Sequence, residues 1–270
     1  MSMSGDVVYS VTQEGGLGDN LEHGFLQSSG LADAFRAARD AEDAETLGFS
    51  DFRPYGTSDD VPASFVAGQI EGTDGKPVGV LVLQIPLDPI NVIMQERTGL
   101  GETGETYLVG PDHLMRSNSF LDSDNRTVEA SFSNPDTGSV NTEAANLALD
   151  GDMGVDIIAD YNGNPVLSAY SSIDVFGVEW AILAEMSVAE AFVPVDSNGE
   201  EFYQKYVDAY GYDDLFLIMP DGYVFYSASK EADYQTNMVD GTFAVSNLGE
   251  LVRTVLKTGK YAIADFAAYA

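Results

Sequence analysis

Runs of apolar and β-branched residues predict two groups of strands, and the first lies in the N-terminal third. Phe49–Tyr55, Ala63–Ile70 and Val78–Ile85 follow one another closely, and the turn Thr73-Asp74-Gly75-Lys76 separates the last two. Val7–Val11 is a shorter run of the same kind, before a loop rich in Gly, Asp and Asn. The spacing predicts an antiparallel meander with one additional strand.

The second group has the same form. Thr106–Val109 and Met115–Ser119 are predicted to form a hairpin, and Val155–Tyr161, Pro165–Ser172 and Trp180–Met186 a three-stranded meander. Each group therefore resembles one five-stranded antiparallel sheet.

Helical spacing separates these strands. Leu31, Phe35 and Ala38 lie on one face of a predicted helix at Leu31–Glu45, and Ser29 is placed to cap it. Further helices are predicted at Ile90–Arg97, Thr142–Leu149 and Glu201–Tyr210. The polar, turn-rich stretch 122–138 is predicted to be a loop. Together the elements predict an α+β fold with helices on one face of each sheet.

An internal repeat sets the domain organisation. Residues 5–36 match residues 222–253 at a constant offset, Val7 answering Val224. The residues shared without a gap are Gly5, Val7, Tyr9, Ser10, Glu14, Asn20, Gly24, Ser29, Leu31 and Arg36. A repeat at this spacing indicates domain-sized modules in tandem. We expect modules at 5–95 and 98–190, then a linker helix and the first part of a repeated module at 196–270, as in a fragment of a longer array.

The repeat also predicts an open sheet edge. Leu215–Met219 and Tyr223–Ser227 read as the first hairpin of the repeated module, and the N-terminal copy has no counterpart of Leu215–Met219. A sheet that lacks an edge strand can pair with a strand from another chain.

The composition of the chain disfavours several kinds of partner and functional site. The chain has 44 acidic and 12 basic residues, a net charge of −32, which disfavours nucleic acid as a partner. It has no cysteine, and no apolar run long enough to span a membrane. His23 and His113 lie in no metal-binding or catalytic spacing, and Asp122-Ser123-Asp124-Asn125 lacks the rest of a calcium loop. We expect no catalysis, no cofactor and no metal.

Several ordered motifs resemble a known family. They are Asp6–Ser10, Asp51–Tyr55, Gly79–Ile85, the turn-and-strand block Gly99–Gly110 with Leu114–Ser117, and Pro165–Tyr170. Over about residues 5–195 the chain is similar to the double Cache sensor region of bacterial and archaeal methyl-accepting chemotaxis receptors. Sensor histidine kinases and cyclases carry related regions.

The resemblance implies two PAS-like modules in series outside the cytoplasmic membrane, within a membrane-anchored parent protein. It implies a small organic ligand in the first, membrane-distal module and signalling by helix displacement. Gln84 stands where amino-acid-binding members carry an Asp, so an amino-acid ligand is not expected.

The candidate ligand-binding residues follow from these assignments. Phe52, Tyr55, Phe65 and Gln84 would converge on the concave face of the first module, as an aromatic pocket with one amide or as ordinary core. Arg116 is suited either to a ligand carboxylate or to one of the many acidic residues. The full set of candidates is Phe52, Tyr55, Phe65, Gln84, Tyr107, Arg116 and Tyr170.

A second interpretation stays open. The tandem copy and the acidic surface also fit a secreted structural or adhesive array. Such an array would assemble as a homodimer or by strand exchange, with Leu215–Met219 as the donated strand.

Overall fold

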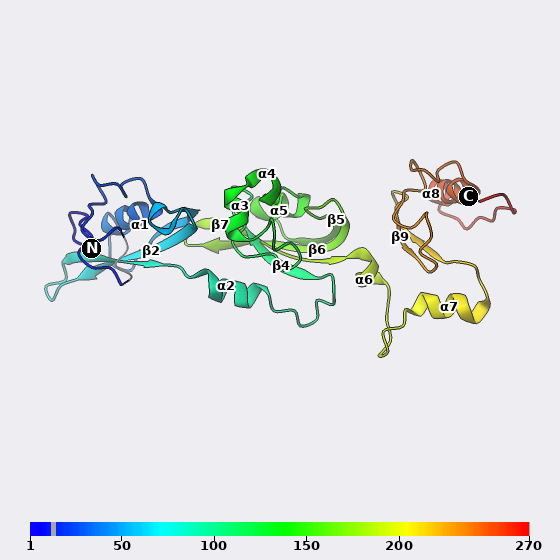
Figure 1. The fold of residues 1–270 in the computed structure, drawn as a ribbon, viewed down its shortest axis with the longest axis horizontal. Helices are drawn as coiled ribbons and strands as arrows, with labels where there is room; N and C mark the ends of the chain where they lie inside the picture. Colours follow the sequence, from blue (N-terminus) through cyan, green and yellow to red (C-terminus); the bar gives the residue numbers. More distant parts are fainter. Residues whose placement is uncertain (12–14, 270) are drawn as a thin grey trace. The chain divides into compact units, whose positions relative to one another are not determined.

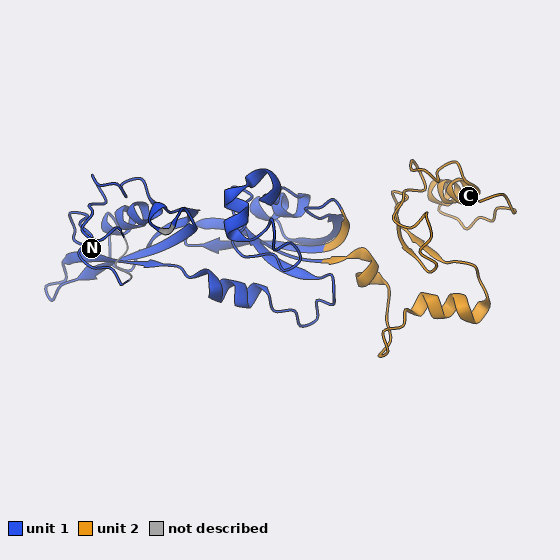
Figure 2. Cartoon of the chain, in the orientation of Figure 1, with its two compact units in different colours: residues 1–163, 168–185 blue, residues 164–167, 186–270 orange. Residues whose placement is uncertain are grey.

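The computed structural model describes residues 1–11 and 15–269. The chain forms two compact units, residues 1–163 with 168–185 and residues 164–167 with 186–270 (Figure 2).

The first sheet of unit 1 has three antiparallel strands in the order β1-β2-β3 (Figure 1). They are β1 (Gly48–Pro54), β2 (Pro62–Glu71) and β3 (Pro77–Gln84), with a 3-10 turn at Gly56–Ser58 between the first two. Helix α1 (Gly30–Arg39) packs against all three strands.

The sequence of α1 explains both its packing and its length. The Ser29 side chain accepts a hydrogen bond from the backbone N–H of Ala32, and Leu31, Phe35 and Ala38 are buried against the sheet. The helix ends at Arg39, six residues before the predicted end. At that end the Gln69 side chain on β2 donates to the carbonyls of Ala38, Arg39 and Ala41 at 3.0, 3.2 and 3.1 Å, which provides partners for the last carbonyl groups of the helix.

The second sheet of unit 1 has four strands in the order β4-β7-β6-β5. They are β4 (Glu105–Val109), β5 (Gly154–Ala159), β6 (Pro165–Val175) and β7 (Val178–Ser187). Strands β4 and β7 pair antiparallel, and short turns join β5 to β6 and β6 to β7. The predicted meander is therefore confirmed.

Four helices accompany this sheet. Helix α2 (Leu87–Met94) connects β3 to β4, and α3 (Val128–Ser133), α4 (Pro135–Gly138) and α5 (Glu143–Leu149) lie on one side of the sheet (Figure 1). The loop predicted at 122–138 is thus wrong in its second half. Capping outweighs the polar composition there, because the side chain of Thr127 accepts a hydrogen bond from Ala130 N and a proline begins α4.

Unit 2 holds the predicted lead-in helix and hairpin. It contains α6 (Val188–Phe192), α7 (Phe202–Tyr210), the two-stranded sheet of β8 (Phe216–Ile218) and β9 (Val224–Ser227), and α8 (Asn247–Thr258). Its small core is formed by Val224, Met238 and Val252.

The antiparallel α+β class is confirmed, but the number of strands is not. Within the described residues the first sheet has three strands where four were expected, and the second has four where five were expected. Around Val7 only the bridge Asp6↔Asn20 forms, because the backbone of Val7 bonds to the following loop. After β4 only the bridge Val109↔Met115 forms.

The two repeated segments make the same hydrogen bonds at the same offset. The bridge Asp6↔Asn20 has its counterpart in Tyr223↔Asn237. Arg36 donates to the carbonyl of Leu21, as Arg253 does to that of Met238. The matched Glu14 lies outside the described residues. The sequence echo is therefore accompanied by matching local hydrogen bonds.

Candidate functional site

An aromatic pair lies between α1 and the first sheet. Tyr55, just after β1, and Phe65 on β2 are buried, with ring centroids 5.0 Å apart in an edge-to-face arrangement. Gln84 is the cross-strand partner of Phe65, and its side chain is exposed. Because paired residues share a face of the sheet, the structure brings these three predicted residues together.

Polar atoms surround this pair. A Cβ atom on Gly30 would lie 2.8 Å from Ser50 Oγ and 3.1 Å from Arg53 Nε, so the glycine allows the start of α1 to approach them closely. The Nη2 atom of Arg53 forms an ion pair with Asp33. Burial alone would raise the pKa of Asp33, but hydrogen bonds from Arg53 and Arg36 lower it overall.

Two polar atoms of residues close to Tyr55 in the sequence are buried without a partner. Among the described residues, Arg53 Nε and Thr57 Oγ1 make no hydrogen bond. Both residues lie within two positions of Tyr55 in the chain. Buried polar atoms are normally paired, so each of these two atoms is available for a hydrogen bond with a water or a ligand.

Phe52 lies elsewhere, because a bulge between Ser50 and Arg53 directs it to the second sheet. Its ring centroid is 6.1 Å from that of Trp180 on β7. On the same strand, Phe49 contacts Phe176 at the β6–β7 turn, with centroids 5.3 Å apart. Strand β1 therefore packs on α1 with one set of side chains and on the second sheet with another.

Arg116 completes this junction and is 1% exposed. Its Nε and Nη2 atoms donate to the two carboxylate oxygens of Asp51 at 2.9 and 2.7 Å. Nη2 also lies 2.9 Å from Asp112, and Nη1 donates to the carbonyl of Leu114 at 3.0 Å. Burial disfavours the charged guanidinium, but the bonds to Asp51 outweigh this and raise the pKa of Arg116. Of the two roles considered from the sequence, the structure shows pairing with protein carboxylates.

Tyr107 is buried in the second sheet. Its hydroxyl donates to Glu185 Oε2 at 2.7 Å, and Ser168 Oγ donates to Oε1 at 2.9 Å. Burial raises the pKa of Glu185, and these two hydrogen bonds only partly offset that. Burial also raises the pKa of Tyr107.

A second buried carboxylate lies beside the first. Glu105 on β4 is the direct cross-strand partner of Glu185 on β7. It accepts hydrogen bonds from Ser119 Oγ at 2.7 Å, from the N–H of Phe120 at 3.0 Å and from the Tyr161 hydroxyl. In the part of the chain that is described, no basic side chain bonds to either carboxylate.

Tyr170 belongs to the core of the second sheet, and its hydroxyl donates to Asp156 Oδ2 at 2.7 Å. The seven predicted residues are thus distributed over the aromatic pair, the junction between the sheets and the second sheet. Sequence reasoning missed Asp51, Glu105, Glu185 and the unpaired Arg53 atom. Asp51 and Glu105 each had one signal, because they lie in the motifs Asp51–Tyr55 and Gly99–Gly110, whereas Glu185 is an isolated acidic residue in an acidic chain and had none.

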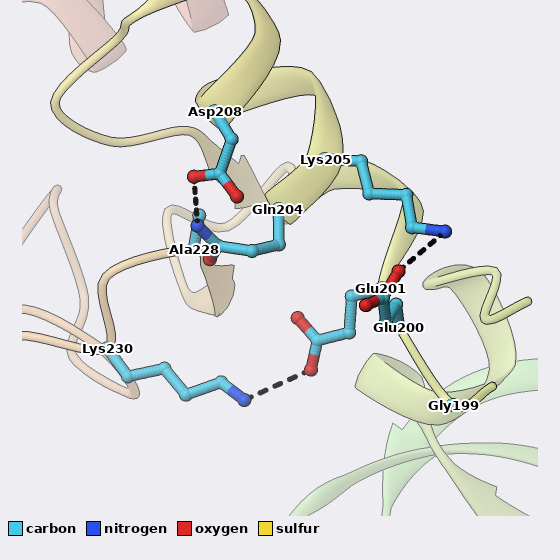
Figure 3. Close-up of a pocket in the computed structure, with 8 residues that line it drawn as sticks. All are labelled: Gly199, Glu200, Glu201, Gln204, Lys205, Asp208, Ala228 and Lys230. Atoms are coloured by element: carbon cyan, nitrogen blue, oxygen red, sulfur yellow. Dashed lines mark hydrogen bonds and ion pairs between the residues drawn. The ribbon is translucent and has the colours of Figure 1, made fainter.

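Unit 2 contains an open hollow of about 400 Å³ beside α7 (Figure 3). Two of the chain's few cations line it, and both are paired: Lys230 with Glu201 at 3.1 Å and Lys205 with Glu200 at 3.0 Å. Because each lysine already has a carboxylate, the hollow offers no free charge of its own. The described residues contain no cluster of three side chains suited to a metal ion.

Comparison with known proteins gives structural neighbours only. No family model matches the sequence, and no curated protein matches it. The periplasmic sensory domain of the Campylobacter jejuni chemoreceptor Tlp1 is similar in structure, with 18% sequence identity and a TM-score of 0.45. That match covers 63% of this chain and 58% of the other.

Two further neighbours are similar in kind. The ligand-binding domain of the Pseudomonas fluorescens chemoreceptor CtaA, solved with L-leucine, has 14% identity and a TM-score of 0.38, over 59% of this chain and 60% of that one. The extracellular domain of rpHK1S-Z16, named as a histidine kinase, has 20% identity and a TM-score of 0.38, over 58% and 59%. The chain thus spans less than two thirds of each neighbour. All are sensory or extracellular domains, the class that the sequence motifs resemble.

No helix in the described residues combines the length and the apolar composition that a membrane crossing requires.

Proposed function

We propose that this chain is an extracytoplasmic sensor region of a membrane-anchored receptor, and that it binds a small organic ligand beside Tyr55 and Phe65. The family resemblance of its motifs supports this role. The observation that carries the proposal is Arg53 Nε, a buried atom without a partner that lies near Phe65, together with the unpartnered Thr57 Oγ1 two residues after Tyr55 in the chain.

The chemistry of these groups favours an organic acid. The two rings offer an apolar surface that excludes water, and Gln84 adds an amide at the exposed rim. Arg53 Nε can only donate a hydrogen bond, so the ligand must present an acceptor oxygen to it. A carboxylate supplies such an oxygen and would form a charge-assisted hydrogen bond with the guanidinium group.

Strand β1 gives a route from this site to the second sheet. Arg53 lies on the ligand side, while its neighbours Asp51 and Phe52 contact Arg116 and Trp180. A ligand that shifts the bulge in β1 would change both contacts. We infer that occupancy is passed on in this way and then through α2 as a helix displacement, without a catalytic step.

A thermal-shift screen tests the proposal, with organic acids, amines, sugars and purines as probes. We expect an organic acid to raise the melting temperature of the full chain. Thr57→Val removes the unpaired hydroxyl with little change of shape, and it should abolish that shift while leaving the free protein at least as stable.

Ser64→Ala is the matched control. Ser64 also carries a buried hydroxyl without a partner, but as the neighbour of Phe65 on β2 it points to the opposite face of the sheet. The control should keep the full ligand shift. A library without any stabilising compound, or a Thr57→Val variant that still responds fully, would contradict the proposal.

A further inference from the structure

Two buried carboxylates lie on neighbouring strands of the second sheet. Glu105 on β4 and Glu185 on β7 are 3% and 4% exposed, and they are direct partners in the antiparallel ladder. Their side chains therefore share one face of the sheet. Like charges directly opposite each other destabilise a strand pair, and each carboxylate disfavours the ionisation of the other. The pair is thus more stable with one proton than with none.

The two carboxylates differ in their hydrogen-bond donors. Glu185 accepts from Tyr107 and Ser168. Glu105 accepts from four groups, namely Ser119 Oγ, the N–H groups of Phe120 and Leu121, and the Tyr161 hydroxyl. Hydrogen bonds to a carboxylate favour its charged form, so Glu105 is the better anion. Burial raises the pKa of Glu185, and the negative charges of Asp160 and Glu105 act in the same direction. The proton accordingly belongs to Glu185.

The arginine of this network does not balance the pair directly. The guanidinium carbon of Arg126 lies 4.1 Å from the ring centroid of Tyr161, and the arginine forms an ion pair with Asp122. In the described contacts it reaches Glu105 only through Tyr161, whose hydroxyl donates to that carboxylate. The proton is therefore what offsets the second negative charge of the pair.

The hydrogen bonds of Glu105 also lead to helix α2. The N–H of Phe120 donates to Glu105 at 3.0 Å, and the ring of Phe120 lies 4.0 Å from the guanidinium carbon of Arg97, just after α2. In the same loop, the N–H of Asn118 donates to Asn91 Oδ1 of α2 at 2.8 Å. Since α2 connects the first sheet to the second (Figure 1), the state of Glu105 bears on that connection.

We propose that Glu105 and Glu185 form a proton-binding site that makes the anchoring of α2 dependent on pH. With a proton on Glu185, β4 and β7 pair stably and Glu105 holds the loop at residues 118–121 against α2. Loss of this proton as the pH rises places two charges on paired residues, which weakens the start of β4 and releases the loop. The site is separate from Tyr55 and Phe65, so this response requires no ligand there.

Nuclear magnetic resonance of the full chain, labelled at the glutamate carboxyl carbons, measures both parts of the proposal. We titrate from about pH 4 to about pH 9, a range that covers exposed and buried glutamates. The Glu185 carboxyl should titrate at higher pH than the exposed glutamates. Over the same transition the amide protection factors of Asn118, Phe120 and Leu121 should fall at least about fivefold. Protection factors are corrected for the pH dependence of intrinsic exchange, so this fall reports a change of structure.

Three variants distinguish this site from a general effect of pH. Glu185→Gln keeps the size of the protonated side chain and cannot ionise, so the fall in protection should disappear. Glu179→Gln removes an exposed carboxylate from the same strand and should keep the fall. In Glu105→Gln the neighbouring charge is gone, and the Glu185 carboxyl should titrate at lower pH than in the native chain.

The fluorescence of Trp180, in the same sheet, checks that each variant folds. If Glu185→Gln does not fold, the carboxyl titration in Glu105→Gln decides the question alone. The proposal is overturned if Glu185 titrates together with the exposed glutamates, if the fall in protection persists in Glu185→Gln, or if Glu105→Gln leaves the titration of Glu185 unchanged.

Discussion

Replacement of Asp51 by Asn is the most direct perturbation of the junction between the two sheets. It keeps the size of the side chain and removes the charge that faces Arg116. The guanidinium would stay buried with the Leu114 carbonyl and Asp112, and the latter is largely in water. The amide can accept from only one of the two guanidinium nitrogens that now donate to Asp51.

The expected loss of stability is large. Removing one partner of a buried ion pair costs about 3–5 kcal/mol, because the other charge is left uncompensated. Since Asp112 and Leu114 remain, we expect the lower end, about 3 kcal/mol. Asp112→Asn is the matched control, because it makes the same change at an exposed partner of the same arginine and should cost less than about 1 kcal/mol.

Urea unfolding followed by tryptophan fluorescence measures this locally. Trp180 is the only tryptophan, and the Arg116 guanidinium lies 6.0 Å from its ring centroid. The signal therefore reports on unit 1 and on this junction. Equal losses for the two Asn variants, or a loss below about 1 kcal/mol for Asp51→Asn, would refute the reasoning.

A double-mutant cycle extends the test. A Cβ atom on Gly110 would lie 2.1 Å from the guanidinium carbon of Arg116, so Gly110→Ala must displace that side chain. The substitution should be costly in the native chain and much cheaper with Arg116→Met, a coupling of about 1–3 kcal/mol. Additive effects would show that the arginine is not held where the structure places it.

Two further predictions concern other parts of unit 1. Burial raises the pKa of Glu185 above its usual 4.5, so the folded chain binds this proton more tightly than the unfolded chain does, and stability falls as the pH rises through the raised value. Glu185→Gln should flatten this fall in melting scans. Glu179→Gln, at an exposed position of the same strand, is the control and should follow the native curve. Ser29→Ala removes the cap of α1 and should cost about 1 kcal/mol in the same urea assay, with Ser28→Ala unchanged.

The strands and helices that depend on local sequence patterns could be predicted from the sequence. The strands around Phe65 and Tyr107 were located because side-chain alternation and flanking turns determine them, and α1 was located by its capping serine. The strand expected at Val7–Val11 was wrong because its backbone bonds to a loop that follows it. No local pattern reports such a choice of partner. The end of α1 was missed for a similar reason, since the carbonyl groups there bond to Gln69, which lies 28 to 31 residues further along the chain.

The candidate site was predictable only where neighbours in space are also neighbours in a strand ladder. Of the predicted group, Tyr55, Phe65 and Gln84 lie near one another, whereas Phe52 packs against Trp180, and their role in ligand binding stays a prediction. Arg116 was recognised as a notable cation, but its partner Asp51 lies 65 residues away and is one acidic residue among 44. Charge composition gives no means of choosing among so many carboxylates. The buried pair Glu105 and Glu185 was missed because the register of β4 on β7 alone brings the two together.

The bulge in β1 explains why one strand can serve both sheets. A regular strand alternates its side chains, so residues 51 and 53 would share a face. The extra residue between Ser50 and Arg53 breaks that alternation, and Asp51 faces Arg116 while Arg53 faces Asp33 on α1. Asp51 and Arg53 are separated by one position and thus form ion pairs on opposite sides of the same sheet. We therefore expect a change at the aromatic pair to alter the contact between Asp51 and Arg116.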